Sequence, residues 1–112
     1  MLVLAVAGLW MVGCEEDDFD HPVPQGMAGL VVDNRTGSRL EVFIDGASQG
    51  TLRPWRHRIW DLRPGVHRLA IRDRDGGGFI AEDADLIEGR LTIAEVYYGD
   101  DIRVPIITWR LK

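Results

Sequence analysis

The chain of 112 residues carries 13 Lys and Arg residues against 18 Asp and Glu residues, a net charge of −5. Its single cysteine excludes an internal disulfide and a metal site built from several cysteines. Five acids lie within residues 15–20, so the 13 acids that follow balance the 13 bases. Nucleic-acid binding needs a broad basic surface, which a folded part without net charge lacks. We therefore expect no nucleic-acid partner.

An apolar run over residues 2–12 opens the chain and leads into Met11-Val12-Gly13-Cys14. Its length suits the apolar region of an export signal, whereas a membrane-spanning helix needs about 20 residues. The four residues resemble the lipobox of bacterial lipoprotein signal peptides. The resemblance implies cleavage before Cys14 and attachment of lipid to its sulfur. A secretory peptide cleaved without lipid and a buried N-terminal element with an inert cysteine are the alternatives.

A linker is expected over residues 14–26, between a signal peptide at 1–13 and a folded domain at 27–112. The acidic run Glu15-Glu16-Asp17-Asp18 repels itself and extends the chain. Pro22 and Pro24 then block helix formation. This composition predicts a disordered or extended segment that holds the domain away from a membrane.

Short apolar stretches separated by turn residues follow Gly29, at the spacing typical of all-β folds. Leu40, Val42 and Ile44 alternate with other residues and so share one face of a strand. Asp45-Gly46 predicts a hairpin turn. Residues 81–88 are also compatible with a helical turn. The pattern predicts a small antiparallel β-sandwich or open barrel, with strands at 30–32, 40–44, 50–52, 57–62, 66–72, 79–82, 91–98 and 102–111.

A resemblance to a known family covers residues 30–72. It is carried by Val31-x-Asp33-Asn34-x-Thr36, Val42-Phe43-Ile44-Asp45-Gly46, Gly50-Thr51-Leu52 and Leu62-x-Pro64-Gly65-x-His67-x-Leu69. This framework resembles the PEGA-type repeat of bacterial surface proteins. The resemblance implies a transthyretin-like or immunoglobulin-like sandwich that serves as an interaction or spacer domain of the envelope.

Metal-binding patterns are weak in this sequence. The stretch from Asp73 to Gly78 begins like a calcium loop, but Ala84 stands where a bidentate carboxylate belongs. A hairpin tip is the better interpretation. The histidines, at 21, 57 and 67, have no spacing typical of metal ligands. We expect no metal and no cofactor.

No catalytic constellation emerges either. Ser38 and Ser48 lie in turn-like stretches, and a hydroxyl without a placed base is unreactive. The pair Asp100-Asp101 is expected to form a solvated turn rather than an acid–base pair. The chain is therefore expected not to be an enzyme.

The stretch Arg53–Trp60 has the most unusual local composition. Strand alternation would place Trp55, His57 and Ile59 on one face and Arg56, Arg58 and Trp60 on the other. Arginine over aromatic rings binds anions and sugars. The candidate binding patch is Trp55, Arg56, Arg58 and Trp60, with an envelope protein, a polysaccharide or anionic lipid headgroups as partner. The alternative is a strand whose tryptophans fill the core while its arginines pair with local acids.

Together these features predict a lipid-anchored, non-catalytic protein of a bacterial cell envelope, attached to the outer membrane through Cys14. It would act by binding or by spacing. The alternative is a carbohydrate-binding or accessory module of a larger surface complex, which would use the candidate patch or an open sheet edge for strand addition.

Overall fold

The computed structural model describes residues 19–100 and 103–112. Cys14 and the predicted signal peptide lie outside these residues. Every regular element of the described part is a strand, which confirms the predicted all-β sandwich. The strands are β1 (Ala28–Asn34), β2 (Leu40–Ile44), β3 (Ala47–Leu52), β4 (His57–Leu62), β5 (Gly65–Asp73), β6 (Phe79–Leu86), β7 (Leu91–Tyr98) and β8 (Pro105–Leu111).

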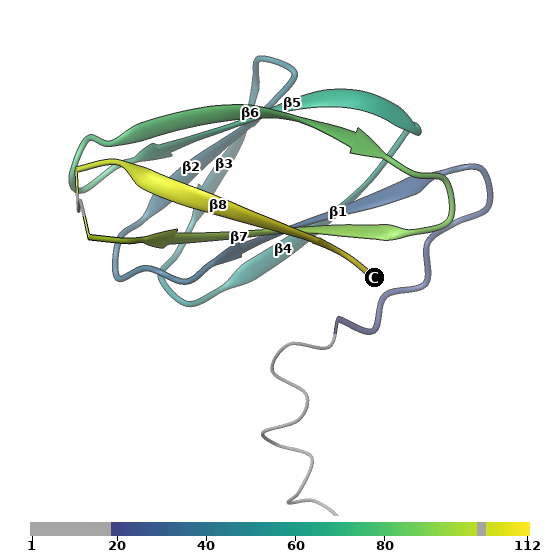
Figure 1. The fold of residues 1–112 in the computed structure, drawn as a ribbon, viewed down its shortest axis with the longest axis horizontal. Coiled ribbons are helices and arrows are strands. Elements are labelled where there is room, and N and C mark those ends of the chain that lie inside the picture. The colour runs from purple at the N-terminus through teal and green to yellow at the C-terminus, as the bar shows by residue number, and fades with distance from the viewer. Residues whose placement is uncertain (1–18, 101–102) are drawn as a thin grey trace, which may run out of the picture.

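The strands form two four-stranded sheets that pack face to face (Figure 1). The first sheet has the order β4-β1-β7-β8 and the second β3-β2-β5-β6. All neighbours are antiparallel except β1 and β7, which run parallel with Gly29 opposite Leu91. The sequence predicted an antiparallel sandwich, and this one pair differs. It arises because the chain crosses to the first sheet after β6 and places β7 beside a strand from the start of the domain.

The core lies between the sheets and is built by strand alternation. In β2 the expected face of Leu40, Val42 and Ile44 is buried, which confirms the predicted alternation. Asp45 and Gly46 both have positive φ, as a type I′ hairpin turn requires. Residues 81–86 continue β6 rather than forming a helical turn, because the pairing with β5 extends to the register of Leu86 opposite Gly65.

Two tryptophans close the two open sides of the sandwich. On one side, Trp60 of β4 donates its indole N–H to the Gln49 side chain of β3 at 3.2 Å. On the other side, Trp109 of β8 donates to Glu82 of β6 at 2.7 Å. Both rings are partly buried against the core. Each indole therefore fills space between the sheets while its one polar atom is satisfied by the opposite sheet.

Phe19 and Val23, in the segment before β1, lie against the outer face of the first sheet, the face turned away from the second sheet. Phe19 is only 5% exposed and joins a second apolar cluster with Val31, Leu91 and Ile93. A disordered or extended linker was predicted over 14–26, and among its described residues Phe19 and Val23 are packed while residues 20, 22 and 24–26 are exposed. The reason is that β1 and β7 present apolar side chains on their outer face too, and the Phe19 ring covers them.

Candidate binding site at the Trp55 turn

Residues 53–56 form a tight turn between β3 and β4. The Arg56 amide donates to the Arg53 carbonyl at 3.3 Å, with Pro54 second in the turn and Trp55 third. Trp55 has φ 62°, the left-handed value that a type II turn requires at its third position and that favours glycine. A residue with a side chain pays about 1–2 kcal/mol for this conformation. The indole is nevertheless 68% exposed, so it contributes little packing in return.

Asn34, at the end of β1, fixes the base of this turn. Its side-chain amide is fully buried and donates to the carbonyls of Leu52 at 3.2 Å and Arg53 at 3.1 Å. Its backbone amide donates to the Arg56 carbonyl at 2.9 Å. The residues on both sides of Trp55 are therefore bonded to one strand of the first sheet, and the strained turn sits on a rigid base.

A hollow of about 320 Å³ lies beside the turn. The Phe19 and His57 rings meet there edge to face, with centroids 4.7 Å apart. Arg35 and Asp33 add an ion pair at 3.8 Å. The hollow thus combines aromatic surface with charged and amide groups, and its lining is Phe19, Asp33, Asn34, Arg35, Trp55 and His57.

The four residues of the candidate patch do not lie on one surface. Trp55 and Arg56 are exposed in the turn. Arg58 and Trp60 lie within β4 and contact each other: the guanidinium carbon of Arg58 is 4.9 Å from the centroid of the Trp60 ring. Arg58 also donates to the Gln49 carbonyl of β3 at 2.7 Å. We therefore assign Arg58 and Trp60 to the seam between the sheets and keep Trp55 and Arg56 as the contact candidates.

The sequence patterns did not point to the rest of the hollow. The predicted strand at 30–32 stops before Asp33 and Asn34, whereas these two residues form the end of β1. Phe19 was hidden inside an acidic stretch. The one available signal was Phe19 itself, because a large aromatic residue within a run of acids has no role in a solvated spacer.

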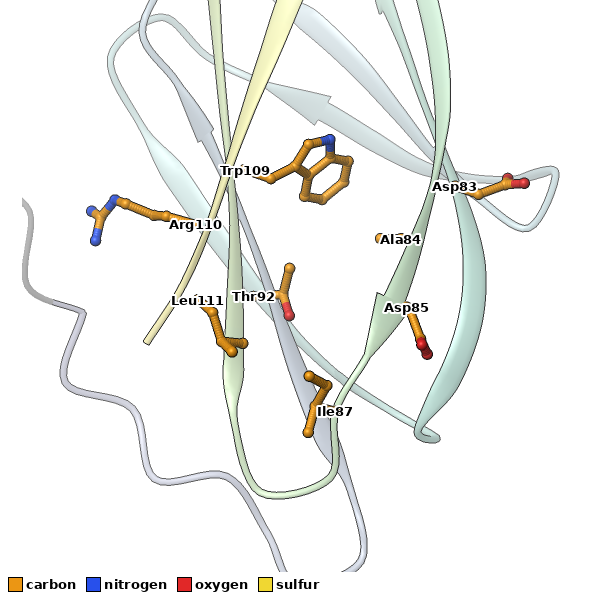
Figure 2. A pocket seen from close by; sticks show the side chains of 8 residues that line it. All are labelled: Asp83, Ala84, Asp85, Ile87, Thr92, Trp109, Arg110 and Leu111. Carbon is orange, nitrogen blue, oxygen red and sulfur yellow. The ribbon is translucent and has the colours of Figure 1, made fainter.

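A second hollow of about 390 Å³ lies between the edge strands β6 and β8. Figure 2 shows Trp109 turned toward Ala84 in its interior, while Asp83 and Arg110 point away from it. Ile87 and Leu111, each 46% exposed, border it. This second hollow, which we call the β6–β8 groove, is mainly apolar and is flanked by two strand edges.

The carboxylates of the Asp73–Gly78 stretch are turned toward protein donors. Asp73 is buried and accepts hydrogen bonds from the amides of Asp75 and Gly76, both at 2.8 Å, and from the Tyr98 hydroxyl. Asp75 pairs with Arg39 at 2.7 Å. Within residues 19–100 and 103–112, no three His, Cys, Asp or Glu side chains gather as a metal site would require. The stretch is the hairpin tip between β5 and β6.

The histidines lie apart from one another and have separate local partners. His21 contacts Asp61 at 2.9 Å. His67 contacts Asp45 at 2.6 Å and the Arg63 carbonyl at 2.7 Å. Burial acts to lower the pKa of His67, but its bonds to Asp45 and to the carbonyl outweigh burial and raise it. These contacts hold turns together rather than assembling a reactive centre.

The hydroxyl of Ser48 donates a hydrogen bond to the carboxylate of Glu41 at 2.8 Å. That hydrogen bond, together with the one from Arg72, lowers the pKa of Glu41. A carboxylate with a lowered pKa is a weak base, so it does not activate the hydroxyl. Asp100 is exposed, and Asp101 lies outside the described residues.

No family model and no curated protein matches this sequence. The solved structures that are similar in fold include both domains of one protein. The C-terminal domain of AlgF from P. aeruginosa superposes with a TM-score of 0.57 at 17% identity, over 79% of this chain and 100% of that domain. The N-terminal domain of the same protein gives 0.58 at 18% identity, over 78% and 96%. At this identity the likeness establishes the sandwich fold alone. In the described part of the chain, no helix has the length and apolarity to cross a membrane.

Proposed function

We propose that this chain is a lipid-anchored, non-catalytic β-sandwich module of a bacterial cell envelope that acts by binding through the Trp55 turn. The observation that carries the proposal is the exposed indole on a left-handed backbone. Strained conformations persist mainly at functional sites. Glycine would suit this turn better, so the tryptophan serves contact rather than stability.

The anchor in this proposal comes from the resemblance of Met11-Val12-Gly13-Cys14 to a lipobox. Stable attachment to a membrane takes more than one acyl chain, which is what modification of both the sulfur and the new amine of Cys14 provides. The Ser48 hydroxyl donates to Glu41, whose pKa is lowered, and no three His, Cys, Asp or Glu side chains of the described residues gather as a metal site would require; both observations support a binding rather than a catalytic role.

The anchor is tested by labelling the protein with radioactive palmitate in a bacterial host. The wild type is expected to incorporate label and to fractionate with membranes. Cys14→Ser removes the acceptor sulfur and is expected to remain unlabelled and uncleaved. Label that persists in Cys14→Ser, or a wild type without label, contradicts the anchor and leaves the fold unaffected.

The Trp55 site is tested by Trp55→Gly. Glycine adopts positive φ freely, so the free energy of unfolding is expected to rise by about 1 kcal/mol. Binding to isolated envelope fractions, measured by co-sedimentation, is expected to be lost. Phe79→Ala is the matched control, because Phe79 is also an exposed aromatic (55%) but lies on the second sheet. Unchanged co-sedimentation of Trp55→Gly rejects the site.

A second candidate function is that of an accessory module in a larger surface complex. The specific observation is the apolar groove between β6 and β8, with Ile87 and Leu111 exposed at its border. An extended segment of another protein adds to such an edge as a further strand. Ile87→Asp with Leu111→Asp is expected to remove crosslinked complexes from native membranes while leaving the Trp55-dependent co-sedimentation intact.

A further inference from the structure

We infer that the Trp55 turn faces the bilayer and that its ligand is the phospholipid headgroup layer of the membrane that holds the anchor. This inference rests on the proposed function, because it identifies what the Trp55 site binds. It follows from the position of Phe19, from the hollow that Phe19 shares with Trp55, and from the charge around the turn.

The first step is the reach of the chain. Only residues 15–18 separate Cys14 from Phe19. Five steps of extended backbone span at most about 18 Å. Phe19 is fixed to the domain, because its ring is buried and its carbonyl accepts a hydrogen bond from Lys112. A lipid on Cys14 therefore keeps Phe19, which packs on the outer face of the first sheet, within about that distance of the headgroups.

The second step is the position of the turn relative to this attachment point. Phe19 and Trp55 line the same hollow, and Phe19 packs on His57, two residues beyond Trp55. In Figure 1 the segment after residue 18 runs beneath the first sheet, on the side away from the second. The Trp55 turn therefore lies beside the residue through which the chain reaches the anchor, and we place it on the side of the domain that faces the bilayer.

The third step is the chemistry of the turn. Tryptophan is enriched at the level of the headgroups, where its ring meets apolar chains and its N–H meets water. Arg53 and Arg56 flank Trp55, and both are exposed. Arginine near a surface of anionic lipids is attracted to the phosphates. The acids at 15–18 are repelled by the same surface, so the contact is assigned to the turn and not to the segment that joins it to the anchor.

A sugar bound by Trp55 is the competing ligand, since a glycan also stacks on an exposed indole. The short reach favours lipid, because headgroups are the chemistry always present within about 18 Å of an acylated Cys14. The experiment treats the glycan as one of its outcomes.

The test uses residues 14–112, which contain every described residue and both apolar clusters. The sole thiol, Cys14, is coupled to a maleimide lipid in vesicles of phosphatidylcholine and phosphatidylglycerol, so the result is independent of acylation in the host. Lipids brominated near the headgroup quench tryptophan that enters this layer. Because Trp55 is one of three tryptophans in 14–112, quenching is expected to remove about a third of the emission.

The Trp55→Phe variant is expected to show no such quenching, because Trp60 and Trp109 are held in the seams. The control is Phe79→Trp in the Trp55→Phe background, which places a reporter on the second sheet and is expected to stay unquenched. In the wild type, Arg53→Ala with Arg56→Ala is expected to weaken binding of the uncoupled domain to anionic vesicles roughly thirtyfold.

Equal emission in brominated and ordinary vesicles overturns the membrane inference. If Trp55→Gly nevertheless loses co-sedimentation with purified envelope polysaccharide, the ligand is a glycan and the proposed site stands. If neither vesicles nor polysaccharide respond to Trp55, the proposed site falls as well. Quenching of the Phe79→Trp reporter equal to that of Trp55 overturns the orientation, since it shows adsorption without a preferred face.

Discussion

Asn34→Asp is expected to lower the free energy of unfolding by about 3–5 kcal/mol at neutral pH, the cost of a buried charge without compensation. The Asn34 amide nitrogen donates to the carbonyls of Ser38, Leu52 and Arg53, at 2.8, 3.2 and 3.1 Å. An aspartate oxygen in its place faces three acceptors and carries no proton. Because the residue is fully buried, water does not replace the lost donors.

The pH dependence identifies the mechanism of this loss. Burial among carbonyls raises the pKa of the introduced carboxyl in the folded state. When the pKa of a carboxyl is higher in the folded than in the unfolded state, the folded protein is favoured more as pH falls. The loss in free energy of unfolding caused by Asn34→Asp is therefore expected to shrink toward acid pH. Urea unfolding of both proteins at several pH values measures this difference.

Asn34→Ala is the control for that experiment. It removes the same donors without adding a charge, so its deficit relative to wild type is expected to be smaller and independent of pH. If Asn34→Asp and Asn34→Ala lose equal stability at every pH, the carboxylate is hydrated and the amide does not clamp the turn.

Asp73→Ala has the second largest expected effect, a loss of about 2–4 kcal/mol, because it leaves charge-assisted hydrogen bonds unmade. The carboxylate accepts from Tyr98 and from the amides of Asp75 and Gly76. Burial acts to raise the pKa of Asp73, but these hydrogen bonds together outweigh burial and lower it.

The direction of the Asp73 pKa fixes the pH at which this stability is lost. A folded pKa below the unfolded value gives stability that is complete above about pH 4 and disappears as pH falls further. Burial and the Asp73 carboxylate raise the pKa of Tyr98, so its contribution is complete below about pH 10 and is lost above that value. Thermal unfolding across pH is expected to show both limits.

In a plot of unfolding temperature against pH, Asp73→Asn is expected to flatten the fall at acid pH. Tyr98→Phe is expected to flatten the fall at alkaline pH. The comparison variant is Asp75→Asn: the hydrogen bond from Arg39 lowers the pKa of Asp75 too, but Asp75 is exposed, so its variant is expected to flatten the fall at acid pH less than Asp73→Asn does. If the unfolding temperature of Asp73→Asn falls with that of the wild type below pH 4, Asp73 is not the group whose protonation destabilises the protein at acid pH.

Much of the fold was predictable because one buried face imposes a period of two. Leu40, Val42 and Ile44 show that period directly, and Asp45-Gly46 supplies the turn that ends the strand. The parallel pairing of β1 with β7 was not predictable, because local patterns carry no information about which distant strand becomes a neighbour.

The candidate site was only half predictable for a related reason. The composition around Trp55 drew attention to the turn that carries the exposed indole. Both Arg56 and Arg58 are exposed, and alternation alone did not show that Arg58 donates to the Gln49 carbonyl. Phe19 packs by a contact with β1 and β7, and the only trace of this tertiary contact in the sequence is the large aromatic residue among acids.

The parallel pairing of β1 with β7 also sets the order of events during folding. β1 is an inner strand of its sheet, yet one of its two neighbours begins at Leu91, opposite Gly29. Closing so long a loop is entropically costly, and folds dominated by distant pairings form slowly. Whenever the chain emerges from its N-terminus, its first sheet therefore stays incomplete until β7 and β8 have followed.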